Sequence, residues 1–196
     1  MLRGITLNHK YKTWHRISSS LKYQSQYVSV HEDHVKLPDG TTIQYTKVKL
    51  PDFVTIVPVI QDKIVMIHNY RYPINRWSLE LPAGFINQAE KPEKTAFREL
   101  QEETGYVPNQ LQSLGWYYPM SSRSEQKAYI FLADKLTKGK TQREKTEQQK
   151  TRIMTKNKVY SKLFNGEIKH SATIITLAMA APLLNLHLNH PLKTEK

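Results

Sequence analysis

The stretch that decides the fold is GFINQAEKPEKTAFRELQEETGY, residues 84–106. It opens on Gly84, carries an isolated Glu90, and ends in a dense acidic run before Gly105. Pro92 suits the first turn of a helix, because the amide hydrogen that proline lacks would have no partner there. Gly105 is typical of the residue that caps the end of a helix. The pattern predicts a helix that begins after Glu90 and ends at Gly105.

Charged side chains gather on one side of this helix. At 3.6 residues per turn that side holds Arg98, Glu99, Glu102 and Glu103. The opposite side, which we expect to pack, holds Phe97, Leu100 and Thr104. Three carboxylates held this close repel one another, and hard oxygen ligands on a rigid helix suit Mg²⁺ or Mn²⁺. The alternative is a solvated helix face whose charges form ion pairs. The spacing of Gly84, Glu90 and Gly105 around these residues argues against it.

The spacing is that of the Nudix box. Gly84 is followed after five residues by Glu90, and after seven more by Arg98-Glu99-Leu100-Gln101-Glu102-Glu103-Thr104-Gly105-Tyr106. The chain therefore resembles the Nudix hydrolase superfamily. Tyr106 fills the last aliphatic position, which is a mild departure at a structural place. The resemblance implies an α/β protein, a Nudix α/β/α sandwich with a mixed β-sheet, that hydrolyses a diphosphate bond with Mg²⁺ (or Mn²⁺).

Motifs outside the box resemble the ADP-ribose pyrophosphatase branch of that superfamily. They are Trp14, the segment Val35-Lys36-Leu37-Pro38-Asp39-Gly40, Tyr70-Arg71-Tyr72-Pro73 and Glu80-Leu81-Pro82-Ala83-Gly84. This branch implies an N-terminal β region at residues 1–50 that helps to form a homodimer, and a Nudix domain at residues 51–196. It also implies that ADP-ribose is cleaved to AMP and ribose 5-phosphate.

The resemblance assigns roles by position. Metal ligands would be Glu99, Glu102, Glu103 and the backbone carbonyl of Ala83, while Arg98 would orient the glutamates. Arg71 would approach the substrate phosphates, although a loop arginine is by default only a surface residue. We expect Glu103→Gln to abolish turnover without unfolding the chain, because it removes a metal ligand on an exposed helix face.

A general base must still accept a proton from the attacking water. The candidates outside the box are Glu125, which would also contact the substrate, and Glu147. Here the chain departs from its relatives, because the loop after the box reads Pro119-Met120-Ser121-Ser122 instead of containing a Pro-Gly pair. The base and the exact substrate therefore stay open at this point.

The flanking sequence predicts the remaining elements. A hairpin is expected from 27–35 and 41–50 around Pro38-Asp39-Gly40, further strands at 53–60, 63–70, 78–81, 114–118 and 128–132, and helices at 158–164 and 173–186. Strands flanking a strong central helix, with helical sequence at the end, favour a mixed sheet between helices.

Composition narrows the function classes. The 196 residues contain no cysteine, which excludes disulfides, thiolate zinc sites and a cysteine nucleophile. The apolar stretch 172–186 is too short for a membrane span, so we expect a cytoplasmic protein that does not use a membrane. The formal charge of +12 favours anionic partners. Residues 135–170 hold eleven Lys or Arg against three Glu, a local net charge of +8.

Two alternatives to a nucleotide-sugar hydrolase remain. The basic segment raises the reading of an enzyme that removes pyrophosphate or a cap from RNA, although such a run is more often a solvated surface. A non-catalytic sensor that binds ADP-ribose is the other alternative. That reading usually needs a damaged box or an attached DNA-binding domain, and the sequence displays neither.

Overall fold

The computed structural model describes residues 13–139 and 149–184, which form two compact units. The first unit comprises the residues up to Leu50 together with Met120–Glu125. The second comprises Pro51–Pro119 and the residues from Gln126 onward. A short loop that interrupts the second unit in sequence therefore belongs with the N-terminal strands.

The first unit is a three-stranded antiparallel sheet in the order β1-β2-β3. Its strands are β1 (His15–Gln24), β2 (Ser29–Lys36) and β3 (Thr42–Lys49). The predicted hairpin is confirmed: Gly40, with a φ of +94°, donates its N–H to the carbonyl of Leu37 at 3.0 Å. Only glycine adopts such a φ readily. β1 was not predicted as a strand, because its serine-rich sequence lacks an apolar alternation.

The loop Met120–Glu125 packs on β3 within this unit. The N–H of Val48 donates to the carbonyl of Arg123 at 2.8 Å. The Arg123 guanidinium lies over the ring of Tyr45, 5.2 Å from its centroid, in a cation–π contact. The loop is thus fixed by backbone and side-chain contacts to a strand far away in sequence.

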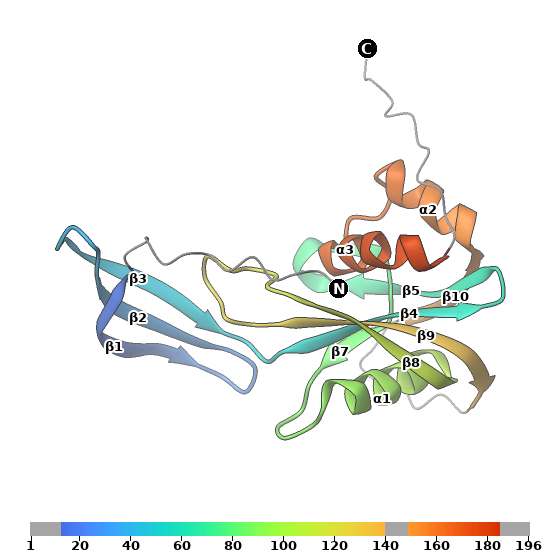
Figure 1. Cartoon of the computed structure of the whole chain (residues 1–196), viewed down its shortest axis with the longest axis horizontal. Coiled ribbons are helices and arrows are strands. Elements are labelled where there is room, and N and C mark those ends of the chain that lie inside the picture. Colours follow the sequence, from blue (N-terminus) through green and yellow to red (C-terminus); the bar gives the residue numbers. More distant parts are fainter. Residues whose placement is uncertain (1–12, 140–148, 185–196) are drawn as a thin grey trace, which may run out of the picture. The chain divides into compact units, whose positions relative to one another are not determined.

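The second unit is built on a seven-stranded mixed sheet (Figure 1). The main path is β10-β5-β4-β9-β8, with β6 paired to β5 and β7 paired to β4. The strands are β4 (Phe53–Ile60), β5 (Lys63–Arg71), β6 (Arg76–Glu80), β7 (Ala83–Phe85), β8 (Tyr106–Tyr117), β9 (Ala128–Lys138) and β10 (Gln149–Thr155). β4 and β9 are parallel, and the other pairs are antiparallel.

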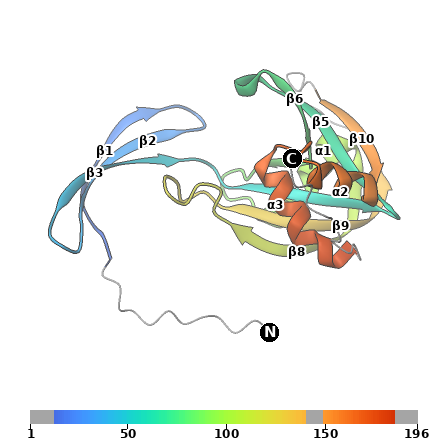
Figure 2. The same ribbon diagram turned by 90° about the horizontal axis from the view of Figure 1, so that it is seen from above.

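Helices cover both faces of this sheet. They are α1 (Pro92–Thr104), α2 (Lys156–Phe164) and α3 (Ser171–Ala180), with short 3₁₀ turns η1 (Tyr72–Ile74) and η2 (Ala181–Leu184). Figure 1 shows α1 on one side, and Figure 2, seen from above, shows α2 and α3 together on the other. The predicted α/β/α sandwich with a mixed sheet and separate N-terminal strands is confirmed.

Side chains of β4 contribute to two hydrophobic cores, one on each face of the sheet. Val54 and Ile56 pack with Leu100 of α1, whereas Val57 packs with Leu177 of α3. Successive side chains of a strand point to opposite faces, so one strand can serve both layers. Both helical layers are therefore anchored to the strand that also pairs with β7.

Candidate active site

α1 carries four charged residues of the candidate site on adjacent turns. The helix begins at Pro92 as predicted, and Gly105, with a φ of 76°, caps its end by donating its N–H to the carbonyl of Gln101. Its packed face differs from the prediction: Ala96 and Leu100 enter the core, but Phe97 is 39% exposed. Leu100 and Ala96, one turn earlier, pack in the same core as Val54 and Ile56 of β4.

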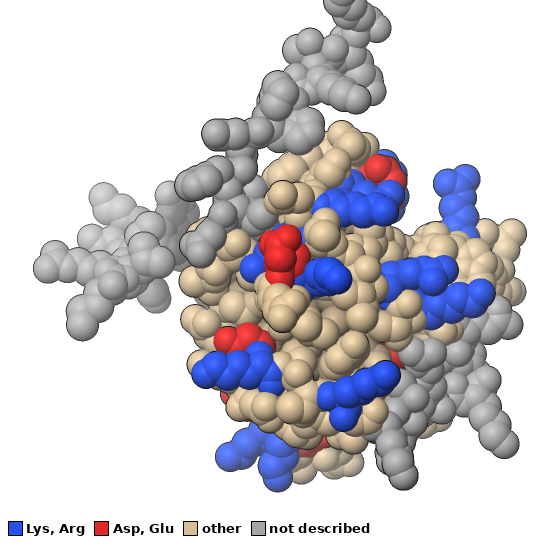
Figure 3. Space-filling model, turned by 90° about the vertical axis from the view of Figure 1, so that its right-hand side faces the viewer, with Lys and Arg blue, Asp and Glu red and all other residues tan. Residues whose placement is uncertain are grey.

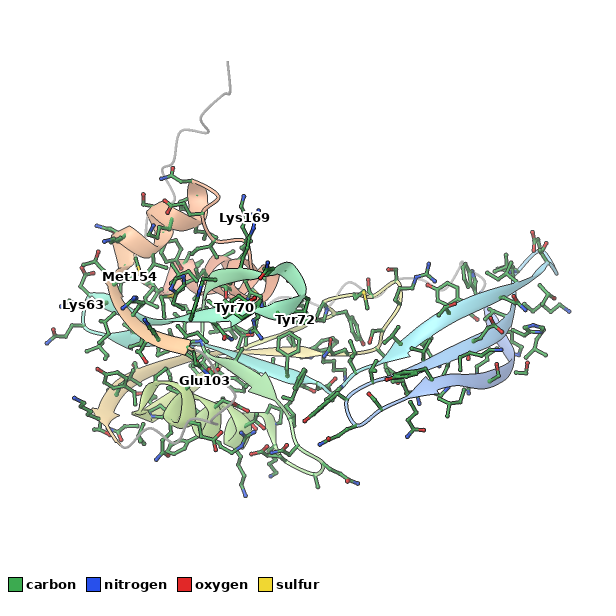
Figure 4. All side chains as sticks on the ribbon, turned by 180° about the vertical axis from the view of Figure 1, so that it is seen from behind. Lys63, Tyr70, Tyr72, Glu103, Met154 and Lys169 are labelled. Carbon is green, nitrogen blue, oxygen red and sulfur yellow. The ribbon has the colours of Figure 1, made fainter. Side chains whose placement is uncertain are left out.

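Glu103 is the most buried of the glutamates on α1, with 4% of its surface exposed. We expected it on an exposed helix face, and that expectation is wrong. Its Oε2 accepts a hydrogen bond from the N–H of Ala83 at 3.0 Å, and its Oε1 accepts one from the side chain of Gln149 at 3.3 Å. Figure 4 shows Glu103 where α1 faces the sheet. The structure thus brings Glu103 and Ala83, two predicted metal ligands, side by side.

Glu99 lies against the backbone of Gly84. A Cβ atom added at Gly84 would overlap the carboxyl group of Glu99. Gly84 is held in turn by strand pairing with Val54 of β4. Glycine is therefore needed at the first position of the box because it has no side chain. The space that a side chain would occupy forms a cradle for the Glu99 carboxylate.

Arg98 holds three carboxylates at once. Its Nη1 donates to Glu99 at 2.7 Å and to Glu102 at 2.9 Å, while Nε and Nη2 donate to Glu90 at 3.2 and 3.1 Å. Burial alone would lower the pKa of Arg98, but these carboxylates outweigh it and raise the pKa above its ordinary value. The hydrogen bond from Arg98 likewise lowers the pKa of Glu90, against the opposing effect of burial. Arg98 and Glu90 are therefore both charged at neutral pH.

The carboxylates are engaged by protein donors. Among residues 13–139 and 149–184, no three His, Asp or Glu side chains converge as a ready-made metal site. The donor set nevertheless fits Mg²⁺ or Mn²⁺, because it offers hard oxygens on adjacent turns. Glu99 and Glu102 already share one cationic nitrogen of Arg98, and the Gly84 cradle seats Glu99. Two carboxylates that can share one cation can share another.

Arg71 forms a second arginine–glutamate centre that sequence reasoning found only in part. Its guanidinium donates to the carboxylate of Glu80 through Nε at 3.0 Å and through Nη2 at 2.6 Å. Glu80 is completely buried. Sequence analysis predicted a role for Arg71 and included Glu80 in a motif, but nothing in the sequence indicates that the two residues pair. A glutamate in an otherwise apolar strand end was the available signal.

The structure describes only one of the two candidate bases, Glu125. Glu125 is exposed and belongs to the first unit, whereas α1 belongs to the second. Glu147 lies outside the described residues. Gln149, which sequence reasoning passed over in the same segment, is the residue that reaches Glu103. The identity of the base stays a prediction.

The basic segment contributes ordinary elements of the second unit. Sequence analysis predicted no strand here, but β10 pairs along β5 from Gln149 to Thr155, with Lys150 and Arg152 exposed. On the face shown in Figure 3, Lys and Arg side chains are dispersed among uncharged and acidic ones instead of forming one patch. Within the described residues, none of the helices is sufficiently long and apolar to span a membrane.

The acidic helix, the glycine cradle and the sandwich are the features expected of a hydrolase of diphosphate bonds. The sequence profile of the NUDIX domain matches residues 49–175. The chain therefore belongs to the Nudix family, and it is a Nudix hydrolase.

Relatives and a solved structure agree with this assignment. The chain is 36% identical over 160 residues to the CMP-5'-(N-acetyl-N-hydroxy-3-aminopropyl)phosphonate hydrolase of Streptomyces rubellomurinus, covering 79% of this chain and 76% of that protein. It is 32% identical over 133 residues to the ADP-ribose pyrophosphatase of Bacillus subtilis, covering 67% and 72%. A crystal structure of an ADP compounds hydrolase superposes with a TM-score of 0.82 at 19% identity, covering 90% and 97%, and shows that the fold is shared.

Proposed function

We propose that this chain hydrolyses, with Mg²⁺ (or Mn²⁺), the diphosphate bond of a nucleoside diphosphate linked to a second group. ADP-ribose is the leading substrate, and AMP and ribose 5-phosphate are the products. The observation that carries the proposal is the Glu99 carboxylate in the Gly84 cradle, beside Glu102 and the Arg98 guanidinium. ADP-ribose is favoured because the Bacillus subtilis relative is an ADP-ribose pyrophosphatase.

Each residue has a definite part in the proposal. The metal would be held by Glu99, Glu102, Glu103 and the carbonyl of Ala83. When bound, such a cation polarises phosphoryl oxygens and lowers the pKa of water. Arg98 keeps Glu99 and Glu102 in one place by donating to both. Arg71 binds substrate phosphate, while Glu125 or Glu147 accepts the proton of water.

The nucleoside is the open variable. The two relatives that cover most of this chain are named for different nucleotides, CMP and ADP. A cytidine compound is therefore a second candidate substrate class. Both would place a nucleoside 5'-phosphoryl group beside the same glutamates.

A substrate panel tests the proposal. The full chain would be incubated with Mg²⁺ and ADP-ribose, GDP-mannose, CDP-linked compounds, dinucleoside polyphosphates or 5'-triphosphate RNA, and products would be separated by chromatography. Preferential release of AMP from ADP-ribose supports the proposal, and release of CMP supports the second candidate. Selective action on RNA would favour the RNA reading. Binding of ADP-ribose without turnover by folded protein would favour the sensor.

A homodimer is also part of the proposal. β1 is one of the two outer strands of its sheet, and Ile17, Leu21 and Tyr23 on it are more than half exposed. Exposed apolar side chains on an edge strand favour burial against another chain. Light scattering should give twice the mass of one chain, and Leu21→Asp should shift it toward the monomer. A monomeric wild type at micromolar concentration would contradict this part.

A further inference from the structure

Glu80 is the most completely enclosed charged side chain near the candidate site. None of its surface is exposed, whereas 43% of the Arg71 side chain is. Strand pairing places Glu80 opposite Ile67 and Arg71 opposite Arg76 at the end of the β5–β6 hairpin. Arg71 therefore reaches back along the hairpin to meet Glu80. Contact through both Nε and Nη2 fixes the plane of the guanidinium, which a single hydrogen bond would not do.

Glu80 is also tied to α3. The Nδ1 of His170 lies 3.9 Å from its Oε2. Thr173 accepts a hydrogen bond from the N–H of Leu81 at 3.0 Å, and its hydroxyl lies 2.9 Å from the same His170 nitrogen. Figure 4 labels Tyr70 and Tyr72, the sequence neighbours of Arg71, and Lys169, the residue before His170 in the sequence. The residue after Glu80 is thus anchored to a helix on the opposite side of the sheet from α1.

The strand that follows Glu80 leads directly to the glutamates of α1. Pro82 accepts a hydrogen bond from the N–H of Ile56 at 2.9 Å, Ala83 donates to Glu103, and Gly84 seats Glu99. Five consecutive residues, 80–84, therefore hold Arg71 at one end and two candidate metal ligands at the other. The separation between the arginine and the carboxylates is set by this short extended segment.

We infer that Glu80 is a positioning residue that holds Arg71 for an anionic group of the substrate. Resting on the proposed function, the inference adds a residue with no direct substrate contact. A buried carboxylate needs a charged partner, and here the partner is the side chain that binds phosphate. Glu80 acts only through Arg71, so its loss should matter only while Arg71 is present.

A double-mutant cycle in the full chain tests this dependence. Glu80→Gln keeps the volume and an oxygen acceptor but removes the charge, and Arg71→Ala removes the partner. With ADP-ribose and Mg²⁺, each single variant should raise KM about ten- to a hundredfold, with a smaller change in kcat. The double variant should be no worse than Arg71→Ala alone. Glu167→Gln, at the exposed ion pair with Lys162, is the matched control and should leave KM unchanged.

The outcomes separate the inference from the function on which it rests. Multiplying effects in the double variant, or an unchanged KM in Glu80→Gln, would overturn the positioning role while the activity stands. Failure of the wild type to turn over any compound of the panel would overturn the proposed function and this inference with it. If Glu80→Gln does not fold, Arg71→Lys replaces it. Lysine keeps the charge but lacks the two-nitrogen grip, so a wild-type KM in that variant overturns the inference.

Discussion

The two arginine–glutamate centres of the second unit differ in their balance of charge. On α1, Arg98 donates to Glu90, Glu99 and Glu102, and Glu103 lies one residue further on. At the β5–β6 hairpin, Arg71 forms an ion pair with Glu80. Negative charge thus exceeds positive charge among the named residues on α1, and the two are equal at the hairpin. The first arrangement calls for a further cation, whereas the second does not.

Glu103→Gln should have the largest effect, because it removes one of the charges that the cation needs. We expect kcat/KM to fall on the order of 10³-fold or more, since a lost metal ligand forfeits several kcal/mol of charge stabilisation. The amide oxygen of glutamine can still accept from the N–H of Ala83, so the free energy of unfolding should change little. Turnover and thermal unfolding would be measured together. The control is Glu93→Gln, at an exposed position of the same helix, and equal activity in both variants would contradict the site.

Gly84→Ala should come next. The added Cβ would displace the Glu99 carboxyl group, and displacing a catalytic group by about 1 Å can cost about 10²-fold in rate. The clash is with the end of a side chain, so the fold should persist. The comparison variant is Gly139→Ala, whose added Cβ would lie closest to the side chain of Val107, at 3.0 Å. Wild-type Mg²⁺ dependence in Gly84→Ala would mean that Glu99 does not need its cradle.

Arg98→Gln sharpens the comparison by removing the internal cation. Without Mg²⁺ the variant should lose about 1–2 kcal/mol of unfolding free energy, because the ion pairs of Arg98 are gone. The loss is no larger because the carboxylates are partly exposed and screened by water. Saturating Mg²⁺ should narrow the gap to the wild type, since carboxylates that have lost Arg98 should bind the ion more tightly, and each tenfold gain in affinity adds about 1.4 kcal/mol. Urea unfolding in EDTA and in Mg²⁺ measures both. A gap that is the same in the two conditions would show that metal and Arg98 do not serve the same carboxylates.

The two centres also differ in how far the sequence reveals them. Arg98 and its glutamates lie within one helix and the turn before it, so their meeting follows from helical spacing. Glu80, His170 and Thr173 meet only through the tertiary fold, and the hydrogen bond from Leu81 to Thr173 spans 92 residues. No periodicity encodes that contact.

Local composition misled the prediction at other places. β10 reads as a solvated basic loop because Lys150 and Arg152 interrupt its apolar residues, yet its backbone pairs fully with β5. Phe97 was expected to pack from helical periodicity, but Ala96 and Leu100 fill the interface with β4. The strands 53–60 and 63–70 were predicted almost to the residue, because buried β-branched runs are a stronger signal.

The smallest expected effect concerns pH at the balanced centre. Burial lowers the pKa of His170 below its ordinary value of 6.5; Arg71 acts in the same direction, and Glu80 opposes it. The unfolded chain therefore binds a proton more readily than the folded chain. This contribution to stability is fully present above about pH 6.5 and decreases as the pH falls toward the folded-state pKa.

His170→Asn should remove this dependence while keeping the start of α3, since asparagine is a favoured helix N-cap. Urea unfolding would be measured between about pH 7.5 and pH 5. The free energy of unfolding should change less with pH in this variant than in the wild type. His34→Asn, in the first unit, should keep the wild-type slope. Equal pH dependence of the free energy of unfolding in wild type and His170→Asn would mean that protonation of His170 does not affect the Arg71–Glu80 pair. The stability of this centre would then depend as little on pH as it is expected to depend on added metal.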